Sequence, residues 1–382
     1  MPAPGEPAKR APGPSTVGEP PASPSRVVAA LSGGVDSSVA AALARDSGRE
    51  VIGLTLRLHG EPDRDGAPRR RASCCAPRDI ADARAIARRL DIPFYVLDAE
   101  ERFERHVVGP FVEAYLEGET PLPCAACNRE LKFGHLLRRA AALGARLLTG
   151  HYARVARAPD GRFRLLRAKD ERRDQSYFLY GLSQEALSQL EFPLGELSKD
   201  EVRAEARARG LRVAEKPDSQ ELCFAPEGYA PFVERRAGRP IPAGRFVTRE
   251  GRRLGATQGV HRYTIGQRRG LPVVGGRATY AVRLDGATGD VEVDFEAGIS
   301  LSEIEVRGAS WPGGAPTGPF EALVRVRHQH PGEVATVTPL VDDRARVRFR
   351  RPVRAPAPGQ AAVFYLDDET VGGGTISAAR RS

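Results

Sequence analysis

The part of the sequence most suggestive of chemistry is Ser-Gly-Gly-Val-Asp-Ser-Ser at residues 32–38, between an apolar run and a helix-forming run. Gly33 and Gly34 let the backbone turn sharply and let an anion approach closely. Serine hydroxyls and the unpaired N–H groups of a helix start can donate hydrogen bonds to phosphate oxygens. An ordinary strand-to-helix turn with an N-cap serine is the simpler alternative, but it does not require this many glycines and serines. We therefore predict a phosphate-binding loop.

The kind of phosphate loop follows from what the segment lacks. A Walker-type loop needs a Gly-Lys-Ser/Thr sequence whose lysine reaches the terminal phosphates, and no lysine occurs between Lys9 and Lys132. The segment resembles instead the pyrophosphate loop of N-type ATP pyrophosphatases, which split ATP between its α- and β-phosphates and adenylate a substrate. This resemblance implies that Asp36 helps to hold Mg²⁺ on the pyrophosphate.

Cysteines form the second group of candidate residues. Cys124-Ala-Ala-Cys127 follows two prolines and precedes a predicted helix, so the helix dipole favours the thiolate, and Cys127 is a plausible nucleophile. The same spacing is also found in half of a zinc site or in a redox pair. The others are Cys223 and the adjacent Cys74 and Cys75, for which an ordinary loop position and a redox or metal role are both open.

Alternating strands and helices are expected to position these residues. Apolar runs at residues 26–31, 51–58, 93–97 and 146–149 read as strands, and residues 39–45, 79–90, 103–115 and 130–143 have helical spacing. This alternation predicts an α/β fold with a doubly wound parallel sheet, whose functional site lies at the carboxyl ends of the strands. The phosphate loop and Gly150-His151-Tyr152 both follow such ends.

The second half of the chain has a different pattern. Residues 163–167 read as a hairpin strand, and Ser198 with Glu201 forms a capping box for a helix that ends near Gly210. Beyond Pro226 the composition shifts to glycine, proline and short β-rich runs, at residues 282–284, 291–293, 322–326, 335–337, 345–349 and 361–364. Short strands at this turn-rich spacing predict a small C-terminal β-barrel.

Charge and hydropathy limit the partners. The formal net charge of +9 is carried almost wholly by arginine, which binds phosphate and stacks on bases, so an RNA partner is compatible with it. A solvated arginine-rich surface explains the charge equally well. No run approaches the roughly 20 apolar residues of a membrane helix, and residues 1–25 read as a disordered tail rather than a signal peptide. A cytoplasmic protein without membrane contact is expected.

Several ordered segments together identify a family. The chain resembles the tRNA-specific 2-thiouridylases from residue 26 nearly to its end, in SGGVDSS (32–38), CNRELKF (127–133), TGHYAR (149–154), DQSYFLY (174–180), DSQELCF (218–224), TIGQRRGL (264–271) and PGQAAVFY (358–365). The resemblance implies a pyrophosphatase-type catalytic domain at residues 26–225, a central linking domain at 226–295 and a tRNA-binding β-barrel at 296–382.

The resemblance also implies a reaction and its residues. ATP adenylates the 2-oxygen of the wobble uridine of tRNA, and sulfur then displaces AMP. Cys223 receives sulfur as a persulfide from a sulfur-carrier protein or a cysteine desulfurase, and Cys127 releases that sulfur by forming a disulfide. The implied ATP contacts are Ala30, Leu31, Ser32, Gly33, Gly34, Val35, Asp36, Ser37, Leu56 and Gly150. The flipped uracil lies against Leu122, Pro123 and Cys124, and the other implied tRNA contacts are His151, Arg173, Asp174, Gln175, Arg327, His328 and Gln360.

One position departs from the common family pattern. Cys124 stands where many members carry an aspartate proposed as an acid or base, and a thiol, with an ordinary pKa of roughly 8.5, is a weaker acid. Cys124, Cys127 and Cys223 could instead hold a 4Fe–4S cluster, although the persulfide route accounts for the cysteines without a metal.

Two further alternatives belong to other functional classes. Another pyrophosphatase-type RNA-modifying enzyme or ligase does not need paired cysteines. A non-catalytic RNA-binding protein does not need an intact phosphate loop.

Overall fold

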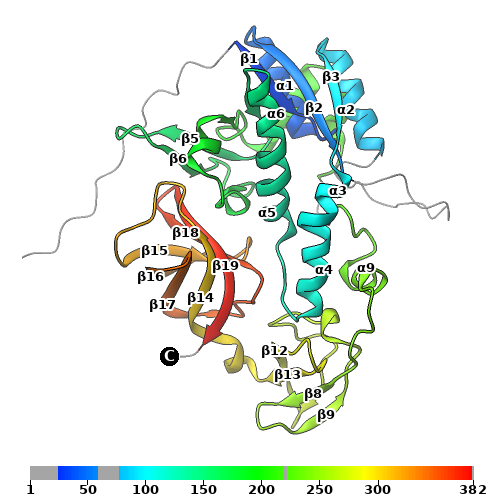
Figure 1. Cartoon of the computed structure of the whole chain (residues 1–382), viewed down its shortest axis with the longest axis vertical. Helices are drawn as coiled ribbons and strands as arrows, with labels where there is room; N and C mark the ends of the chain where they lie inside the picture. The colour runs from blue at the N-terminus through cyan, green and yellow to red at the C-terminus, as the bar shows by residue number, and fades with distance from the viewer. Residues whose placement is uncertain (1–24, 59–76, 219–221, 381–382) are drawn as a thin grey trace, which may run out of the picture.

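The computed structural model describes residues 25–58, 77–218 and 222–380. The predicted N-terminal tail, except for Ser25, and the pair Cys74 and Cys75 lie outside these residues. Figure 1 shows three parts: a parallel sheet with helices at the top, a β-barrel at the lower left, and a smaller β-rich part at the bottom. Within the described ranges, no helix combines the length and apolarity needed to cross a membrane.

A five-stranded parallel sheet forms the N-terminal part. Its strands lie in the order β3-β2-β1-β4-β7, and each neighbouring pair is parallel. Their bounds are β1 (Arg26–Ala30), β2 (Glu50–Arg57), β3 (Phe94–Asp98), β4 (Arg146–Leu148) and β7 (Leu190–Glu191). The predicted strands are confirmed to within a residue or two.

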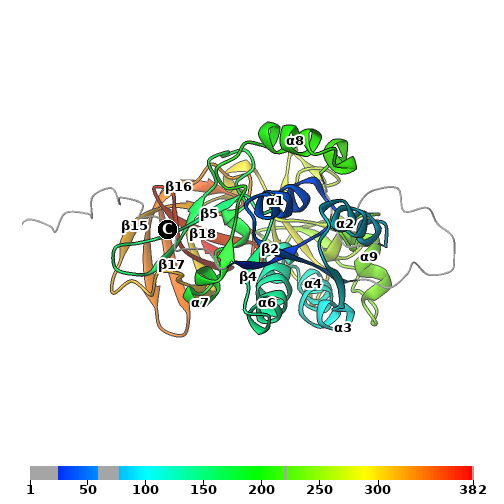
Figure 2. The same cartoon turned by 90° about the horizontal axis from the view of Figure 1, so that it is seen from above.

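Helices cover both faces of this sheet, which confirms the doubly wound fold. Figure 2 shows α1 (Val35–Asp46), α2 (Pro77–Leu90) and α8 (Lys199–Ala208) on one face and α3 (Glu100–Phe103), α4 (Gly109–Leu116) and α6 (Leu137–Ala142) on the other. Side chains alternate along β1, so Val27 packs in the core under α1 while Val28 packs in the opposite core with Leu131.

The helix that carries the cysteine motif begins earlier than predicted. Pro123 opens α5 (Pro123–Cys127), which continues through the π-helical segment η2 (Asn128–Leu136) into α6. Proline suits a first helical position because it has no N–H to satisfy there. A second π-helical segment, η1 (Glu104–Val108), joins α3 to α4. Cys124 therefore lies in the first turn of a helix and Cys127 at the start of the second, and neither lies before the helix.

The middle of the chain forms a small separate sheet. Its strands, in the order β12-β13-β8-β9, are β8 (Arg245–Thr248), β9 (Arg253–Ala256), β12 (Tyr280–Leu284) and β13 (Val291–Asp294). The runs at 282–284 and 291–293 are strands of this sheet and not of the barrel. The other short elements here are α9 (Tyr229–Arg236), η5 (Val260–Arg262), β10 (Val273–Val274), β11 (Arg277–Ala278) and η6 (Glu296–Ile299).

The C-terminal part is a closed six-stranded barrel, as predicted. Its order is β14-β17-β16-β15-β18-β19, and β14 pairs with β19 to close it. The strands are β14 (Ser300–Ser310), β15 (Phe320–Arg325), β16 (Glu333–Leu340), β17 (Arg344–Arg354), β18 (Ala361–Leu366) and β19 (Glu369–Arg380). Strands β14 and β19 were not predicted, because polar residues and glycines interrupt their apolar pattern.

The barrel is joined to the N-terminal part in two places. The hairpin of β5 (Ala153–Arg157) and β6 (Phe163–Arg167) extends the barrel sheet, since β6 pairs with β19 at Leu166 and Glu369. The turn before β18 contacts the loop before α5: Thr120 donates its N–H to the Pro358 carbonyl at 2.8 Å, and the Gln360 amide donates to the Thr120 carbonyl at 3.0 Å. Two short elements, η3 (Ser176–Phe178) and α7 (Gln184–Ser188), complete this region, and η4 (Arg212–Glu215) packs in the core under α1.

Gly359 lies at this contact, and its replacement is expected to destabilise the protein. Gly359 has a φ of +89°, and a Cβ there would lie 2.9 Å from the Thr120 backbone. Gly359→Ala is expected to lower the free energy of unfolding by about 1–3 kcal/mol through strain and displacement of the loop. Gly318→Ala in the same barrel meets no atom within 4 Å and is expected to change it by about 0.5 kcal/mol or less. Chemical denaturation of both variants checks this, and equal stability of the two would contradict it.

Candidate active site

One cavity unites the phosphate loop with the cysteines. It has a volume of about 240 Å³ and lies where β1, β2 and β4 end, opposite α5 and η2. The predicted site residues that line it are Ala30, Leu31, Ser32, Asp36, Ser37, Leu56, Pro123, Cys124, Cys127, Gly150, His151, Gln175 and Cys223. Segments separated by almost 200 residues in the sequence thus meet in one place.

The phosphate loop has a fixed internal structure. Ser37 Oγ accepts a hydrogen bond from the Ser32 N–H at 3.2 Å and donates to the Gly34 carbonyl at 3.1 Å. Ser38 is fully buried, and its hydroxyl donates to the same carbonyl at 2.8 Å. Ser38 therefore caps the loop from within, whereas Ser32 and Ser37 face the cavity.

Two glycines are required by close backbone contacts. Gly33 has a φ of +73°, and a Cβ there would lie 2.2 Å from the Asp79 carbonyl oxygen. A Cβ on Gly150 would lie 2.6 Å from the backbone of both Asp36 and Ser37. The segment after β4 can thus pack against the loop only with glycine at residue 150. A larger residue at either position would displace the backbone of the loop, whether or not a ligand is bound.

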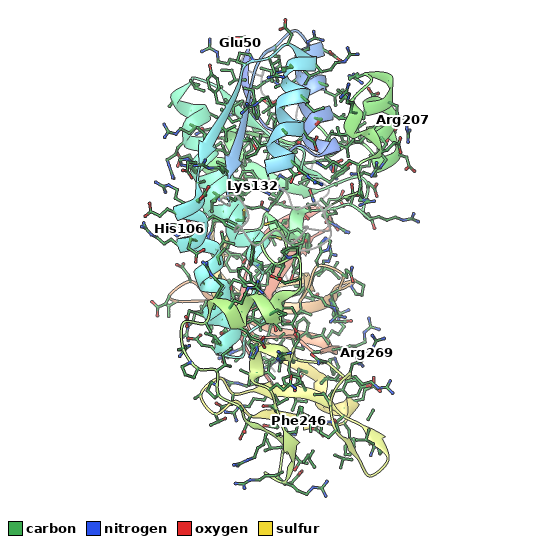
Figure 3. All side chains as sticks on the ribbon, turned by 90° about the vertical axis from the view of Figure 1, so that its right-hand side faces the viewer. Glu50, His106, Lys132, Arg207, Phe246 and Arg269 are labelled. Carbon is green, nitrogen blue, oxygen red and sulfur yellow. The ribbon has the colours of Figure 1, made fainter. Side chains whose placement is uncertain are left out.

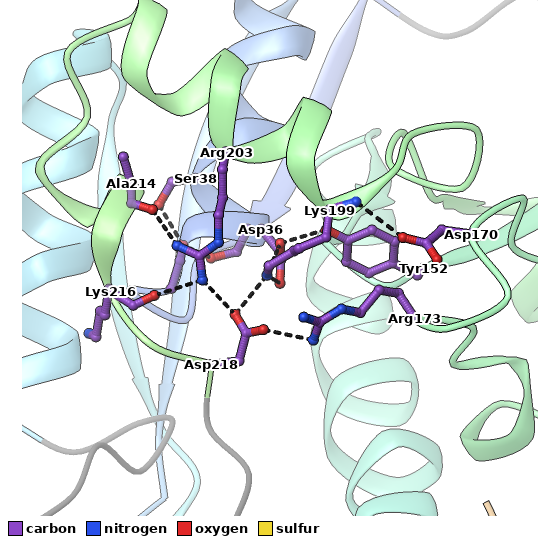
Figure 4. A network of polar contacts seen from close by, with 12 residues as sticks. Asp36, Ser38, Tyr152, Asp170, Arg173, Lys199, Arg203, Ala214, Lys216 and Asp218 are labelled. Carbon is purple, nitrogen blue, oxygen red and sulfur yellow. Dashed lines mark hydrogen bonds and ion pairs between the residues drawn. The ribbon is translucent and has the colours of Figure 1, made fainter. Parts of the chain in front are cut away.

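Asp36 is the centre of a charged network shown in Figure 4. Its carboxylate accepts hydrogen bonds from Lys199 Nζ at 2.8 and 2.9 Å and from the Tyr152 hydroxyl at 2.9 Å. Lys199 Nζ also lies 2.7 Å from a carboxylate oxygen of Asp218. Burial, together with the charge of Asp36, raises the pKa of Tyr152 above its ordinary value, so the hydroxyl stays protonated as a donor.

Asp218 is in turn held by arginines. Arg173 lies 2.8 Å and Arg203 3.4 Å from its carboxylate. Burial raises the pKa of Asp218, but Lys199 and the two arginines outweigh it, so the pKa lies below the ordinary value. The carboxylate is therefore ionised at neutral pH.

A second lysine supports the loop from outside the cavity. Lys216 Nζ donates to the Gly33 carbonyl at 3.0 Å and contacts Asp79 at 2.7 Å and Asp82 at 2.5 Å. Burial lowers the pKa of Lys216, but the two carboxylates outweigh it and raise the pKa overall. Neither Lys199 nor Lys216 was predicted as part of the site, because both lie more than 160 residues from the loop in the sequence. The capping box at Ser198 indicated the helix that begins with Lys199, but not the contact of this lysine with Asp36.

The three described cysteines differ in exposure. Cys127 is buried, Cys223 is intermediate and Cys124 is exposed. The ring of Phe224 packs against Phe103 and Phe111, with centroids 5.7 and 4.9 Å apart, and so fixes the segment after Cys223 on the helices. Among the residues that the structure describes, no three or more histidine, cysteine or acidic side chains are grouped to hold a metal ion. The donor arrangement gives no support to a cluster.

His151 is held as a neutral ring in the cavity wall. Its Nδ1 lies 2.9 Å from Thr149 Oγ1, and its ring packs on Phe133 with centroids 5.5 Å apart. Burial lowers the pKa of His151 well below its ordinary value, and the charge of Lys132 adds to this effect. The side chain can therefore contact a base without carrying charge.

Other residues expected to contact tRNA have structural partners. The Asp174 carboxylate, only 1% exposed, accepts hydrogen bonds from the N–H groups of Ala168 and Ser176 and lies 3.6 Å from Arg325 of the barrel. This carboxylate is too deeply buried to contact RNA directly. Its neighbour Gln175 lines the cavity and accepts the Tyr152 N–H at 3.0 Å.

The remaining expected contacts lie outside the cavity lining. His328 Nε2 lies 3.2 Å from the Asp174 carbonyl oxygen, Arg327 is exposed, and Leu122 packs against a core cluster that includes Tyr177. Gln360 binds the loop at Thr120. His328, Leu122 and Gln360, like Asp174, hold the barrel against the N-terminal part, whereas Arg327 donates to the Arg354 carbonyl within the barrel at 3.2 Å.

Most arginines on strand β17 are paired. Arg348 lies 3.2 Å from Glu303, Arg350 2.9 Å from Glu321 and Arg351 3.0 Å from Glu333. These ion pairs are compatible with a solvated arginine-rich surface. Figure 3 shows Arg269 near the end of the molecule that contains Phe246, far from Lys132 in the cavity wall.

Comparison with known families covers almost the whole chain. Residues 25–227 match the family described as the tRNA methyl transferase HUP domain. Residues 231–294 match its PRC-barrel domain, and residues 301–376 match the aminomethyltransferase beta-barrel domain.

Curated relatives carry a more specific name. The tRNA-specific 2-thiouridylase MnmA of Sorangium cellulosum is 49% identical over 98% of each chain. Those of Geobacter metallireducens and Rhodospirillum centenum are each 46% identical, over 93% and 94% of this chain and 97% and 93% of theirs. The shared sequence thus includes the phosphate loop, the cysteine helix, the central sheet and the barrel, and this chain belongs to the tRNA-specific 2-thiouridylase family.

Proposed function

We propose that this protein catalyses the ATP-dependent 2-thiolation of the wobble uridine of tRNA. The observation that carries the proposal is the single cavity lined by the phosphate loop, Cys127 and Cys223. Activation of a carbonyl oxygen by ATP and its replacement by sulfur need a phosphate site and sulfur chemistry within one reaction volume. The family membership supports the same reaction.

In the first step the uracil 2-oxygen attacks the α-phosphate of ATP, and the α–β bond breaks to release pyrophosphate. The N–H groups at the start of α1 and the hydroxyl of Ser32, which lines the cavity, are the donors proposed for the phosphate oxygens. The implied ATP contacts, residues 30–37 with Leu56 and Gly150, lie at this strand edge. Mg²⁺, when bound, supplies charge neutralisation on the pyrophosphate, and Asp36 is the residue proposed to hold it.

In the second step sulfur replaces the activated oxygen. A sulfur-carrier protein or a cysteine desulfurase delivers sulfur to Cys223 as a persulfide. The Cys127 thiolate attacks the inner sulfur of that persulfide, a disulfide forms between Cys127 and Cys223, and hydrosulfide is released. The hydrosulfide attacks C2 of the uracil and expels AMP, and an external thiol reductant then returns the disulfide to two thiols.

Several competing chemistries fit the cavity less well. Methyl transfer, which the family descriptions name, does not require ATP cleavage beside two cysteines. Lysidine synthesis and amidation use adenylation but have no need for the cysteines. The iron–sulfur route lacks a grouped set of donors among the described residues, so we derive no step through a cluster.

The three parts have separate proposed roles. Residues 26–225 carry the catalytic cavity, residues 226–295 link it to the barrel, and residues 296–382 bind tRNA and hold the loop before α5. Arg327 on the exposed barrel surface and Arg173 near the cavity are the arginines proposed to contact tRNA, with His151, Gln175 and His328 between them. A cytoplasmic location is proposed with this function, because that is where a tRNA substrate would be met.

The phosphate loop generates the first prediction for activity. Asp36→Asn keeps the size of the side chain but removes its charge, so pyrophosphate release with ATP and tRNA is expected to fall by about 10²-fold or more. Binding of tRNA is expected to be unchanged. Radiolabelled ATP cleavage and filter binding measure the two. Asp98→Asn, on an exposed carboxylate paired with Arg57, is the matched control, and unaltered pyrophosphate release in Asp36→Asn would refute the role of Asp36.

The cysteines generate a prediction that separates the two steps. Cys127→Ala and Cys223→Ala are each expected to abolish thiolation while still forming adenylated tRNA, because adenylation does not use sulfur. Cys124→Asp is expected to keep most of the activity, since it introduces the carboxylate common at this position in the family. Thiolated nucleoside is measured by mass spectrometry beside iron content. Activity strictly proportional to bound iron would contradict the persulfide route.

The barrel generates a prediction for RNA affinity. Arg327→Ala is expected to weaken tRNA binding and to reduce the slope of log affinity against log salt by roughly 0.7–0.9, the value of one lost phosphate contact. Arg350→Ala is the control, because Arg350 is exposed and paired with Glu321. Filter binding over a range of salt concentrations tests both. The same slope in wild type and Arg327→Ala would show that Arg327 does not contact a phosphate group of tRNA.

A further inference from the structure

Lys132 is the only cationic side chain among the described residues that line the active-site cavity. The other titratable side chains of this lining are one carboxylate, one imidazole and three thiols, those of Asp36, His151, Cys124, Cys127 and Cys223. Since burial lowers the pKa of His151 well below its ordinary value, that ring is neutral. The positive side-chain charge of the described cavity wall thus comes from Lys132.

A π-helical segment turns Lys132 toward the cysteines. The helix that begins at Pro123 lines the cavity with Pro123, Cys124, Cys127, Lys132 and Leu136. In a regular α-helix of 3.6 residues per turn, residue 132 would point about 140° away from residue 127, and residue 136 about 180° away. The backbone hydrogen bonds of a π-helix join residues five apart, so its wider turn brings residue 132 back toward the side of residue 127. The segment η2, which starts directly after Cys127, thus places a lysine on the cavity side.

The position of Cys127 makes a neighbouring positive charge important for its reactivity. Cys127 lies at the start of the second helical turn, where the effect of the helix dipole is already falling off. Its side chain is only 9% exposed and belongs to an apolar core cluster that includes Val107 and Leu131. Burial in apolar surroundings disfavours a thiolate, whereas a neighbouring lysine favours it. A nucleophilic thiolate at residue 127 therefore requires a cation to offset the cost of burial.

We propose that Lys132 stabilises the Cys127 thiolate that attacks the persulfide of Cys223. In that attack the Cys127 Sγ forms a bond with the Cys223 Sγ, the bond from Cys223 Sγ to the outer sulfur breaks, and the outer sulfur leaves with the electron pair as hydrosulfide. The negative charge moves from one sulfur atom to another within the cavity, so the same ammonium group also lies beside the product. The inference rests on the proposed persulfide route, but it can be tested without ATP or tRNA.

The place of Lys132 in the cavity favours sulfur over phosphate as its partner. Lys132 is on the helix that carries Cys127, and this helix lies opposite the phosphate loop. The loop has phosphate donors of its own in the N–H groups at the start of α1 and in Ser32. Next to burial, the charge of Lys132 is the second cause that lowers the pKa of His151, so this charge acts on other groups of the cavity wall.

The pH dependence of cysteine alkylation tests this inference. Reduced full-length protein is treated with iodoacetamide over a pH range that spans the ordinary thiol pKa of roughly 8.5, and mass spectrometry of the peptides gives the rate at each cysteine. In Lys132→Met the midpoint of the pH profile for Cys127 is expected to rise by about one pH unit, because an opposite charge that favours the thiolate is lost. The rate at neutral pH is expected to fall about three- to tenfold, since the more basic thiolate is scarcer but somewhat more nucleophilic.

Two control variants separate the charge of the side chain from its shape. Lys132→Arg keeps the charge and is expected to keep the midpoint near that of the wild type. Lys169→Met removes an exposed lysine that does not line the cavity, and it is expected to leave the midpoint unchanged. The midpoint does not depend on how easily the reagent enters the cavity, because access changes only the rate reached at high pH. If Lys132→Met does not fold, Lys132→Gln, which is also neutral, takes its place.

The outcomes separate this inference from the proposed function. An unchanged midpoint in Lys132→Met would overturn the inference, and a loss of ATP affinity in the same variant would then assign the lysine to a phosphate group. An equal rise in Lys132→Met and Lys132→Arg would overturn it as well, because the shape of the side chain and not its charge would then be responsible. A rise in Lys132→Met alone supports the inference even if the wild-type protein fails to thiolate tRNA, a result that would overturn the proposed function alone.

Discussion

The site depends on one electrostatic arrangement, a buried ammonium group held between two carboxylates. Lys199 joins Asp36, at the start of α1, to Asp218, five residues before Cys223. Breaking such an arrangement leaves an uncompensated charge with restricted access to water, which is strongly unfavourable. The phosphate loop, α8 and the segment leading to the second cysteine are therefore positioned together and not separately. This explains how segments so distant in the sequence share one cavity.

The barrel contributes to the same geometry. Its Gln360 and Pro358 hold the loop that opens α5, and its Arg325 lies beside the buried carboxylate of Asp174, next to cavity-lining Gln175. Gln360 and Asp174, which were expected to contact tRNA from the family resemblance, thus also form contacts between the barrel and the N-terminal part. A substitution at such a residue is therefore expected to change both the proposed RNA-binding surface and the cavity.

Local sequence patterns predicted most helices and strands but not the long-range contacts between them. The parallel strands, the helices around them and the capped helix at Ser198 follow from apolar spacing and capping chemistry, which act over a few residues. Strands β14 and β19 escaped prediction because their side chains alternate imperfectly. The loop and both cysteines were recognisable as motifs, whereas Lys199, Lys216 and the buried state of Asp174 depend on tertiary packing, which no local spacing encodes.

The pairing of β19 also constrains how the molecule can form. This strand, which follows all the others in the described residues, pairs on one side with β14 to close the barrel and reaches β6 near its beginning. Until it emerges from the ribosome, β14 and β18 each keep an unpaired edge, and the hairpin of β5 and β6 has no neighbour in the barrel. Long-range pairings of this kind are slow to form and leave edges exposed to aggregation. Barrel closure is thus expected to be a late step in folding.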